Sequence, residues 1–182
     1  KHAVVNFADN RGVDTILAEH EPLRLRSRLV GDPIDWVVRH AHCDVLLVDN
    51  LGYDDPKHVV LSGERGPYPA LAVNVADAVT AANGGELSLW YPVGTDAHRE
   101  TIDDYQTELS ELLTIPVSTE PVRADGGQPS TPDLLVRRGD DGFGLFADRP
   151  IFPSPGCTTV TVYPHASRRP GLTRRLGERL TF

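Results

Sequence analysis

The stretch that decides the fold is residues 58–92, HVVLSGERGPYPALAVNVADAVTAANGGELSLWYP. It opens with an apolar run at 58–62, which predicts a strand, and continues through a turn rich in glycine and proline. Apolar residues then recur at helical spacing over 69–82, and the Gly-Gly pair that follows is a helix stop. A second apolar run at 87–93 predicts another strand. The segment therefore predicts a strand, a crossover helix and a parallel strand, the repeating unit of an α/β sheet.

The residues that follow extend this alternation and then interrupt it. An amphipathic pattern over 96–113 predicts a second helix, and 116–122 predicts the next strand. The connection at 125–132 is too short and too rich in Gly and Pro to form a crossover helix. Strands resume at 133–137 and at 158–163, with a Gly- and Pro-rich loop between them. The predicted fold class is α/β, with a layered parallel sheet.

The residues before 58 predict a shorter set of elements. We expect a strand at 2–8, a short helix at 13–20 and an alternating strand at 23–30. A Gly-Asp-Pro sequence then starts a helix over 33–41, because Asp caps helices and Pro suits their first position. The apolar run at 44–49 is typical of a strand buried on both faces of a parallel sheet.

Charge composition limits the partners. The chain has 26 acidic and 18 basic residues, a formal net charge of −8, and Lys1 and Lys57 are its lysines. Phosphate backbones require a basic face, so nucleic acid is not an expected partner. An acidic, lysine-poor surface suits concentrated salt, and we interpret the source as a halophile, with a high-GC mesophile as the alternative.

Cysteine use and hydropathy indicate the compartment. Cys43 and Cys157 are far apart in sequence, which does not suit a disulfide scaffold and favours a reducing cytoplasm. One long-range disulfide between them is the alternative. No apolar run is long enough to cross a bilayer, and the N-terminus has no signal-peptide pattern, so we expect a soluble piece.

The pattern resembles a known family. Residues 58–92 resemble the first β-α-β unit of the universal stress protein family, in which a small-residue loop precedes a long Ala/Val-rich helix and a Gly-Glu-Leu strand start. The Gly-Asp-Pro helix start and the strand at 44–48 resemble the later half of that family. Because this order is wrong for one domain, we interpret the chain as a degenerate tandem. Its predicted parts are a partial repeat at 1–50, a linker at 51–57, a fuller repeat at 58–165 and a basic tail at 166–182. The resemblance implies the adenine-nucleotide α-hydrolase-like layered fold, and an unrelated member of that fold is the alternative.

The resemblance also implies where a nucleotide would bind. Nucleotide-binding members of the family have an acidic residue after the first strand and Gly-x2-Gly-x9-Gly-Ser/Thr after the fourth, because glycines let backbone amides approach phosphates. Here the first position falls at Ser62 and Gly63, with no Asp. Gly139 and Gly142 start the second motif, but Phe152 replaces its third glycine and two acidic residues lie between the glycines. The implied site, Ser62, Gly63, Gly139 and Gly142, is therefore degenerate. We expect no cofactor, with ATP as the alternative.

Other motifs do not define a catalytic site. The sequence after Ser62 shares only Ser-Gly with the loop of ATP pyrophosphatases, and no Gly-x-Ser-x-Gly elbow is present. His40, His42 and Cys43 lack further ligands at metal-binding spacing, and histidines at a helix C-terminus suit its dipole. We expect no enzyme and name no catalytic residue. An α/β hydrolase or nucleotidyl-transfer enzyme is the third and least supported interpretation.

The C-terminal tail carries Leu172, Leu176 and Leu180 among arginines. This pattern predicts a short basic amphipathic helix on an anionic membrane surface or an acidic partner, with a flexible or self-docked terminus as the alternative. The last predicted strand, 158–163, is expected at a sheet edge, where unpaired backbone groups would support a homodimer.

The resemblance implies a function as well. Tandem repeats of this family are found in the cytoplasmic C-terminal regions of transporters, including amino-acid permeases and cation antiporters or cotransporters. A chain without a start methionine or any other methionine looks like a fragment of such a protein. We therefore expect a non-catalytic regulatory domain on the cytoplasmic face of an archaeal cell membrane, joined to a transporter membrane domain. It would sense a ligand or partner and mediate dimerisation. A free-standing nucleotide-binding stress protein is the alternative.

Overall fold

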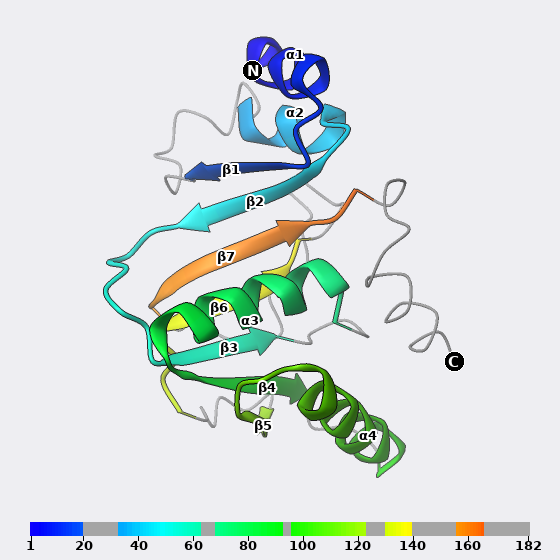
Figure 1. Cartoon of the computed structure of the whole chain (residues 1–182), viewed down its shortest axis with the longest axis vertical. Coiled ribbons are helices and arrows are strands. Elements are labelled where there is room, and N and C mark those ends of the chain that lie inside the picture. The colour runs from blue at the N-terminus through cyan, green and yellow to red at the C-terminus, as the bar shows by residue number, and fades with distance from the viewer. Residues whose placement is uncertain (20–32, 63–67, 93–95, 123–129, 140–155, 166–182) are drawn as a thin grey trace.

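The computed structural model describes residues 1–19, 33–62, 68–92, 96–122, 130–139 and 156–165, which form a seven-stranded sheet with flanking helices (Figure 1). The strand order is β1-β2-β7-β6-β3-β4-β5. The strands are β1 (Thr15–Glu19), β2 (Asp44–Asp49), β3 (His58–Ser62), β4 (Glu86–Pro92), β5 (Val117–Val122), β6 (Leu134–Arg138) and β7 (Thr158–Tyr163). The helices are α1 (His2–Arg11), α2 (Pro33–His40), α3 (Ala70–Asn83) and α4 (Asp96–Leu112). Of the described strand pairs only β2–β7 is antiparallel, so the predicted α/β class with a mostly parallel sheet is confirmed.

Helices α3 and α4 cover one face of the sheet, here called the α3 face. Val59 and Leu61 of β3 point to it and pack with Ala72 and Val73 of α3 in one buried core. Both helices lie on the same face because the steps from β3 to β4 and from β4 to β5 run in one direction, and such crossovers are right-handed. Figure 1 shows α3 lying across β6 and β3.

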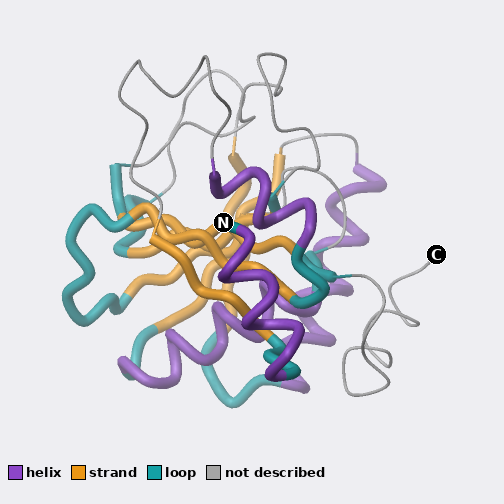
Figure 2. Tube along the Cα trace, turned by 90° about the horizontal axis from the view of Figure 1, so that it is seen from above, coloured by secondary structure: helices purple, strands orange, loops and turns teal. Residues whose placement is uncertain are grey.

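Helices α1 and α2 cover the other side of the sheet, here called the opposite face, over β1 and β2. Val5 and Ala8 of α1 and Val37 of α2 pack on Ile16 and Val45 in a second core. Figure 2 shows that the described helices lie on both sides of the strands. A third, smaller cluster of Val60, Trp90, Val122 and Leu135 lies on the opposite face over β3 to β6. The described residues therefore form buried cores on both faces of one sheet.

The central β-α-β unit follows the prediction closely. Helix α3 ends where Gly84 adopts a left-handed conformation at φ 60°, and the Gly85 N–H donates to the Thr80 carbonyl at 3.0 Å. This is the helix stop that the Gly-Gly pair predicted. The buried ring of Tyr68 stacks on Tyr105 of α4, with ring centroids 5.1 Å apart. This contact ties the residues just before α3 to α4 on the α3 face.

The first two predicted elements are wrong. Residues 2–8 were expected as a strand, but they belong to α1, in which Val5 and Ala8 are buried at helical spacing. Gly12 closes this helix at φ 61°, and its N–H donates to the Asp9 carbonyl. The helix expected at 13–20 is instead β1, because pairing with β2 and the alternation of buried Ile16 with exposed Leu17 decide its conformation. The strand expected at 23–30 lies outside the described residues.

The position of β7 also differs from the expectation. It was expected as an edge strand, but it lies between β2 and β6 (Figure 1), antiparallel to the first and parallel to the second. Its backbone is therefore not open for pairing with a second copy. Strand β2 was expected in a parallel environment and is parallel to β1 only. Val45 and Leu47 of β2 are buried, whereas Leu46 and Val48 on its α3 face are partly exposed.

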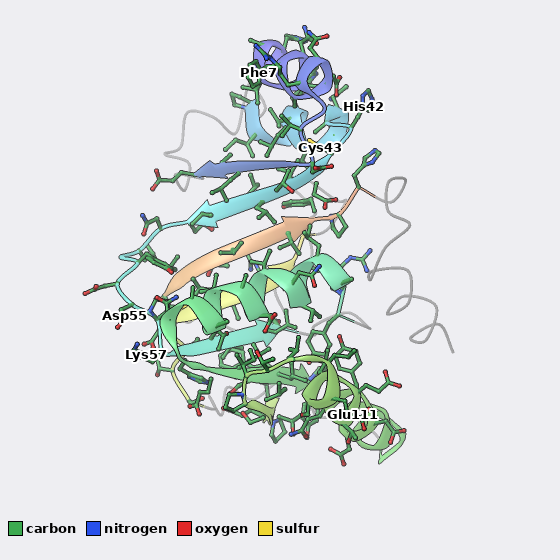
Figure 3. All side chains as sticks on the ribbon, viewed as in Figure 1. Phe7, His42, Cys43, Asp55, Lys57 and Glu111 are labelled. Atoms are coloured by element: carbon green, nitrogen blue, oxygen red, sulfur yellow. The ribbon has the colours of Figure 1, made fainter. Side chains whose placement is uncertain are left out.

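The segment at 51–57, predicted as a linker, is tied to the second part of the sheet. The Asp133 carboxylate accepts hydrogen bonds from the N–H groups of Lys57 and His58, each at 2.9 Å. The Lys57 ammonium donates to Asp55 at 3.0 Å and to the Asn83 carbonyl, and Figure 3 shows Asp55 and Lys57 together at this turn. These contacts fix where β3 begins.

Candidate functional site

The candidate site lies at the carboxyl ends of β3 and β6. These strands are parallel neighbours, and Ser62 at the end of β3 is in register with Arg137 of β6. Gly139 follows β6, so two of the four predicted site residues, Ser62 and Gly139, lie at the same edge of the sheet. Gly63 and Gly142 lie outside the described residues. The carboxyl edge of a parallel sheet is where ligands of α/β proteins bind.

Gly139 has a packing role. A Cβ atom at this position would lie 2.1 Å from Cε1 of the Tyr163 ring, far inside contact distance. Its N–H donates to the Val162 carbonyl at 2.8 Å, which continues the pairing of β6 with β7. The glycine is therefore explained by the close approach of an aromatic ring and needs no bound phosphate.

Ser62 belongs to a row of side chains that crosses the opposite face. In strand register the row runs Trp90, Ser62, Arg137, Thr161 and Leu47. Trp90 and Leu47 are buried apolar ends, and three polar side chains lie between them. The sequence prediction missed Arg137 and Thr161, because they are ordinary members of alternating strands until the register places them beside Ser62.

The polar part of this row has one internal hydrogen bond and one unmatched hydroxyl. Nε of Arg137 donates to Oγ1 of Thr161 at 3.2 Å. Ser62 is 5% exposed, and its Oγ has no hydrogen-bond partner in the described structure. A buried hydroxyl without a partner costs about 1–3 kcal/mol. The hydroxyl of Ser62 and the Nη groups of Arg137 are therefore hydrogen-bond donors for which the described structure gives no acceptor.

A second polar cluster lies at the amino ends of β3, β4 and β5. Nε2 of His58 is 2.9 Å from Oγ of Ser88, which is 2.9 Å from Oγ of Ser118. Oε1 of Glu120 is 3.7 Å from the same His58 nitrogen, and Oγ of Ser130 donates to the Glu120 carboxylate at 2.8 Å. A nucleophile and its orienting carboxylate would need opposite nitrogens of the ring, and Ser88 is 1% exposed. The cluster therefore holds strand ends together and does not form a catalytic triad.

The residues considered as metal ligands have other contacts. Nδ1 of His40 is 2.8 Å from the Trp36 carbonyl, and its ring stacks on Trp36. Nδ1 of His42 is 3.3 Å from Oδ2 of Asp9, whereas Cys43 is buried (Figure 3). No group of three or more ligand-type residues forms a metal cluster within the described ranges.

Among the helices that the structure describes, none is long and apolar enough to cross a membrane.

Comparisons with solved structures give the fold. No family model and no curated protein matches the sequence. A universal stress protein from Archaeoglobus fulgidus DSM 4304 superposes with a TM-score of 0.58 at 11% identity, covering 92% of this chain and 66% of that one. The chain therefore has the universal-stress-protein-like α/β fold, and the predicted resemblance is confirmed at the level of the fold.

A second solved structure is more similar to the chain as a whole. The cytoplasmic domain of a prokaryotic cation chloride cotransporter superposes with a TM-score of 0.68 at 15% identity, covering 91% of this chain and 71% of that one. The likeness extends over nearly all of the chain, including both the short first part and the longer second part.

Proposed function

We propose that this chain is a non-catalytic regulatory domain on the cytoplasmic side of a membrane transporter. The observation that carries the proposal is the match to the cotransporter domain over 91% of the chain, with a TM-score of 0.68. A universal stress protein matches less well, at 0.58.

The arrangement of strands supports the proposal that residues 1–50 are a partial repeat and residues 58–165 a fuller one. Strand β2 pairs antiparallel with β7, and each has a parallel neighbour on its outer side, β1 and β6. The two pairs are therefore related by an approximate two-fold axis through the β2–β7 pair. Beyond β6 the sheet continues through β3, β4 and β5, whereas β1 ends the described sheet.

A cell-fractionation experiment tests the transporter context. Antibodies against residues 1–182 should detect, in cells that express the native gene, a polypeptide clearly larger than 19.9 kDa that stays in the membrane after carbonate extraction. A soluble polypeptide of about that mass would contradict the proposal. The partner that we propose is a transporter membrane domain in the same chain, and a larger polypeptide held in the membrane is the result expected from it.

Homodimerisation is a second part of the proposal. Since β7 is interior, the described edges are β1 and β5. Pro121 of β5 has no N–H to donate, so β1 is the better edge for pairing. Sedimentation at tens of micromolar should show a dimer, and disruption by Leu17→Lys on β1 would locate it there. A monomer at that concentration would refute dimerisation of this chain by itself.

A free-standing nucleotide-binding protein is the alternative function, favoured by Ser62 at the carboxyl edge and by the likeness to a stress protein. Titration calorimetry with ATP and magnesium in high salt tests nucleotide binding, and no heat would remove this alternative. If ATP binds, the cell-fractionation experiment decides whether the protein is free-standing or held in the membrane. The predicted tail contact with an anionic membrane falls at 166–182, outside the described residues.

A further inference from the structure

The row of polar side chains on the opposite face has the character of an anion site. Arg137 lies between Ser62 and Thr161, on three neighbouring strands about 4.8 Å apart. All three side chains point to the same face because they share one register row. A small ion above the row is within reach of Arg137 and of the hydroxyl beside it.

The guanidinium of Arg137 is held by a hydrogen bond to Thr161 and keeps further N–H groups that can donate to a ligand. Its Nε donates to Oγ1 of Thr161 at 3.2 Å, and Thr161 is 8% exposed. Among the described residues no carboxylate forms an ion pair with Arg137. The Nη groups therefore retain four N–H donors in a planar fork, which suits two oxygens of one anion. Arg137 is only partly buried, so an ion from solvent can reach it.

Ser62 supplies an independent second observation. Its side chain is 5% exposed and its Oγ has no partner in the described structure, although it stands next to Arg137 in register. A buried hydroxyl is normally hydrogen-bonded. An anion held by Arg137 would accept this missing hydrogen bond.

We propose that Arg137 and Ser62 bind a small oxyanion of the phosphate class, with Thr161 positioning the guanidinium. This site differs from the glycine motif considered from the sequence, because Gly139 packs on Tyr163 and the donors are side chains of β3 and β6. It stands independently of the transporter proposal. The oxyanion is either free phosphate or the phosphate of a nucleotide, and the experiment separates these sources.

The overall charge makes the test specific. A chain with a net charge of −8 repels anions in general, so weak unspecific binding is not expected. Arg138 provides a matched control: it neighbours Arg137 in sequence, is exposed, and points to the α3 face in register with Val162. Arg138→Gln removes the same charge from the other side of the sheet.

The experiment is thermal unfolding of the 182-residue chain in increasing inorganic phosphate, at ionic strength held constant with sodium chloride, and in parallel with AMP and with ATP and magnesium. Phosphate also stabilises proteins generally, so the measured quantity is the saturable shift relative to Arg137→Gln. We expect Arg137→Gln to weaken binding at least about 10-fold, because hydrogen bonds from a charged donor are strong. Ser62→Ala should weaken it about 3- to 10-fold. Arg138→Gln should leave it unchanged.

Each outcome decides the proposal. A saturable shift that depends on Arg137 and not on Arg138 supports it, and a shift with AMP or ATP but not with free phosphate assigns the anion to a nucleotide. No saturable shift with any of these ligands, or equal losses in Arg137→Gln and Arg138→Gln, overturns it. If circular dichroism shows that Arg137→Gln does not fold, Arg137→Lys replaces it in the binding measurements. Lysine keeps the positive charge but lacks the planar pair of Nη groups that would bind two oxygens of the anion. Unchanged affinity in both Arg137→Lys and Ser62→Ala would refute the site.

Discussion

Replacing Gly139 by alanine tests whether this glycine serves packing or phosphate binding. The added Cβ would lie 2.1, 2.3 and 2.6 Å from three atoms of the Tyr163 ring. Contacts this short force the ring or the strand end to move, and overpacking of this kind costs about 1–3 kcal/mol. For a chain of this size we expect Gly139→Ala to lower the Tm by roughly 2–12 °C, at about 2–4 °C for each kcal/mol.

A double-mutant cycle identifies the cause. Tyr163→Ala removes the ring, so Gly139→Ala should cost at least about 1 kcal/mol less in that background than in the parent chain. Gly85→Ala is the matched control, because its Cβ would lie 2.3 Å from the backbone carbonyl oxygen of Lys57. That clash is not relieved by Tyr163→Ala, and the two changes should add. The reasoning is refuted if Gly139→Ala unfolds at the parent temperature, or if its cost is the same with and without the ring. Chemical denaturation monitored by circular dichroism gives the free energies of unfolding.

Three further predictions concern the cores and the polar cluster. Leu47→Ala removes a buried side chain of β2 next to the β2–β7 pair and should lower the free energy of unfolding by about 2–4 kcal/mol, measured by denaturant titration; a loss below about 1 kcal/mol would contradict a packed junction. Glu120→Ala removes the acceptor of Ser130 and should cost about 1–2 kcal/mol, with Glu120→Gln costing less; equal costs would show that the hydrogen bonds are not the cause. Burial raises the pKa of Tyr68 and of Tyr105 well above the ordinary value of 10.0, so both phenols stay neutral in the folded chain. Above pH 10 the unfolded chain loses these protons and the folded chain does not, and stability should fall by up to about 1.4 kcal/mol per pH unit for each tyrosine. In denaturant titrations between pH 9 and about pH 11, the free energy of unfolding of Tyr68→Phe should fall less steeply with pH than that of the parent chain. An equally steep fall in the two proteins would contradict the burial of Tyr68.

The elements that the sequence predicts correctly are those in which local signals agree. In α3, apolar residues at helical spacing coincide with a glycine stop at Gly84, and β3 and β4 are apolar runs of strand length. Helix α4 carries an amphipathic pattern over its length and ends within one residue of the expectation. In these elements the local sequence pattern and the tertiary contacts favour the same conformation.

The errors lie where long-range contacts decide. The β-branched pair Val4-Val5 favours a strand locally, but burial of Val5 and Ala8 on α2 and the cap at Gly12 select a helix. The position of β7 depends on its pairing with β2, more than a hundred residues earlier in the chain, which no local pattern contains. Tertiary pairing overrides propensity in both cases.

For the same reason, the sequence predicted only part of the candidate site. Ser62 could be found from its place at a strand end, but Arg137 is one of two adjacent arginines in a short strand. Because side chains alternate along a strand, the two arginines must lie on different faces of the sheet. The alternation does not indicate which of them lies beside a buried hydroxyl. Only the register of β3, β6 and β7 brings Arg137, Ser62 and Thr161 into one row.

The central claim is that this domain regulates a transporter, and transport itself tests it most directly. The full-length native protein would be reconstituted in proteoliposomes. Its solute uptake, with cations and chloride as the first solutes tried because of the fold likeness to the cotransporter domain, would be compared with that of a protein lacking residues 1–182 and with that of Leu47→Ala. The account predicts that membrane insertion persists while the uptake rate, or its response to ligands of the domain, changes in the truncated protein and partly in Leu47→Ala. Identical uptake with and without the domain would contradict it.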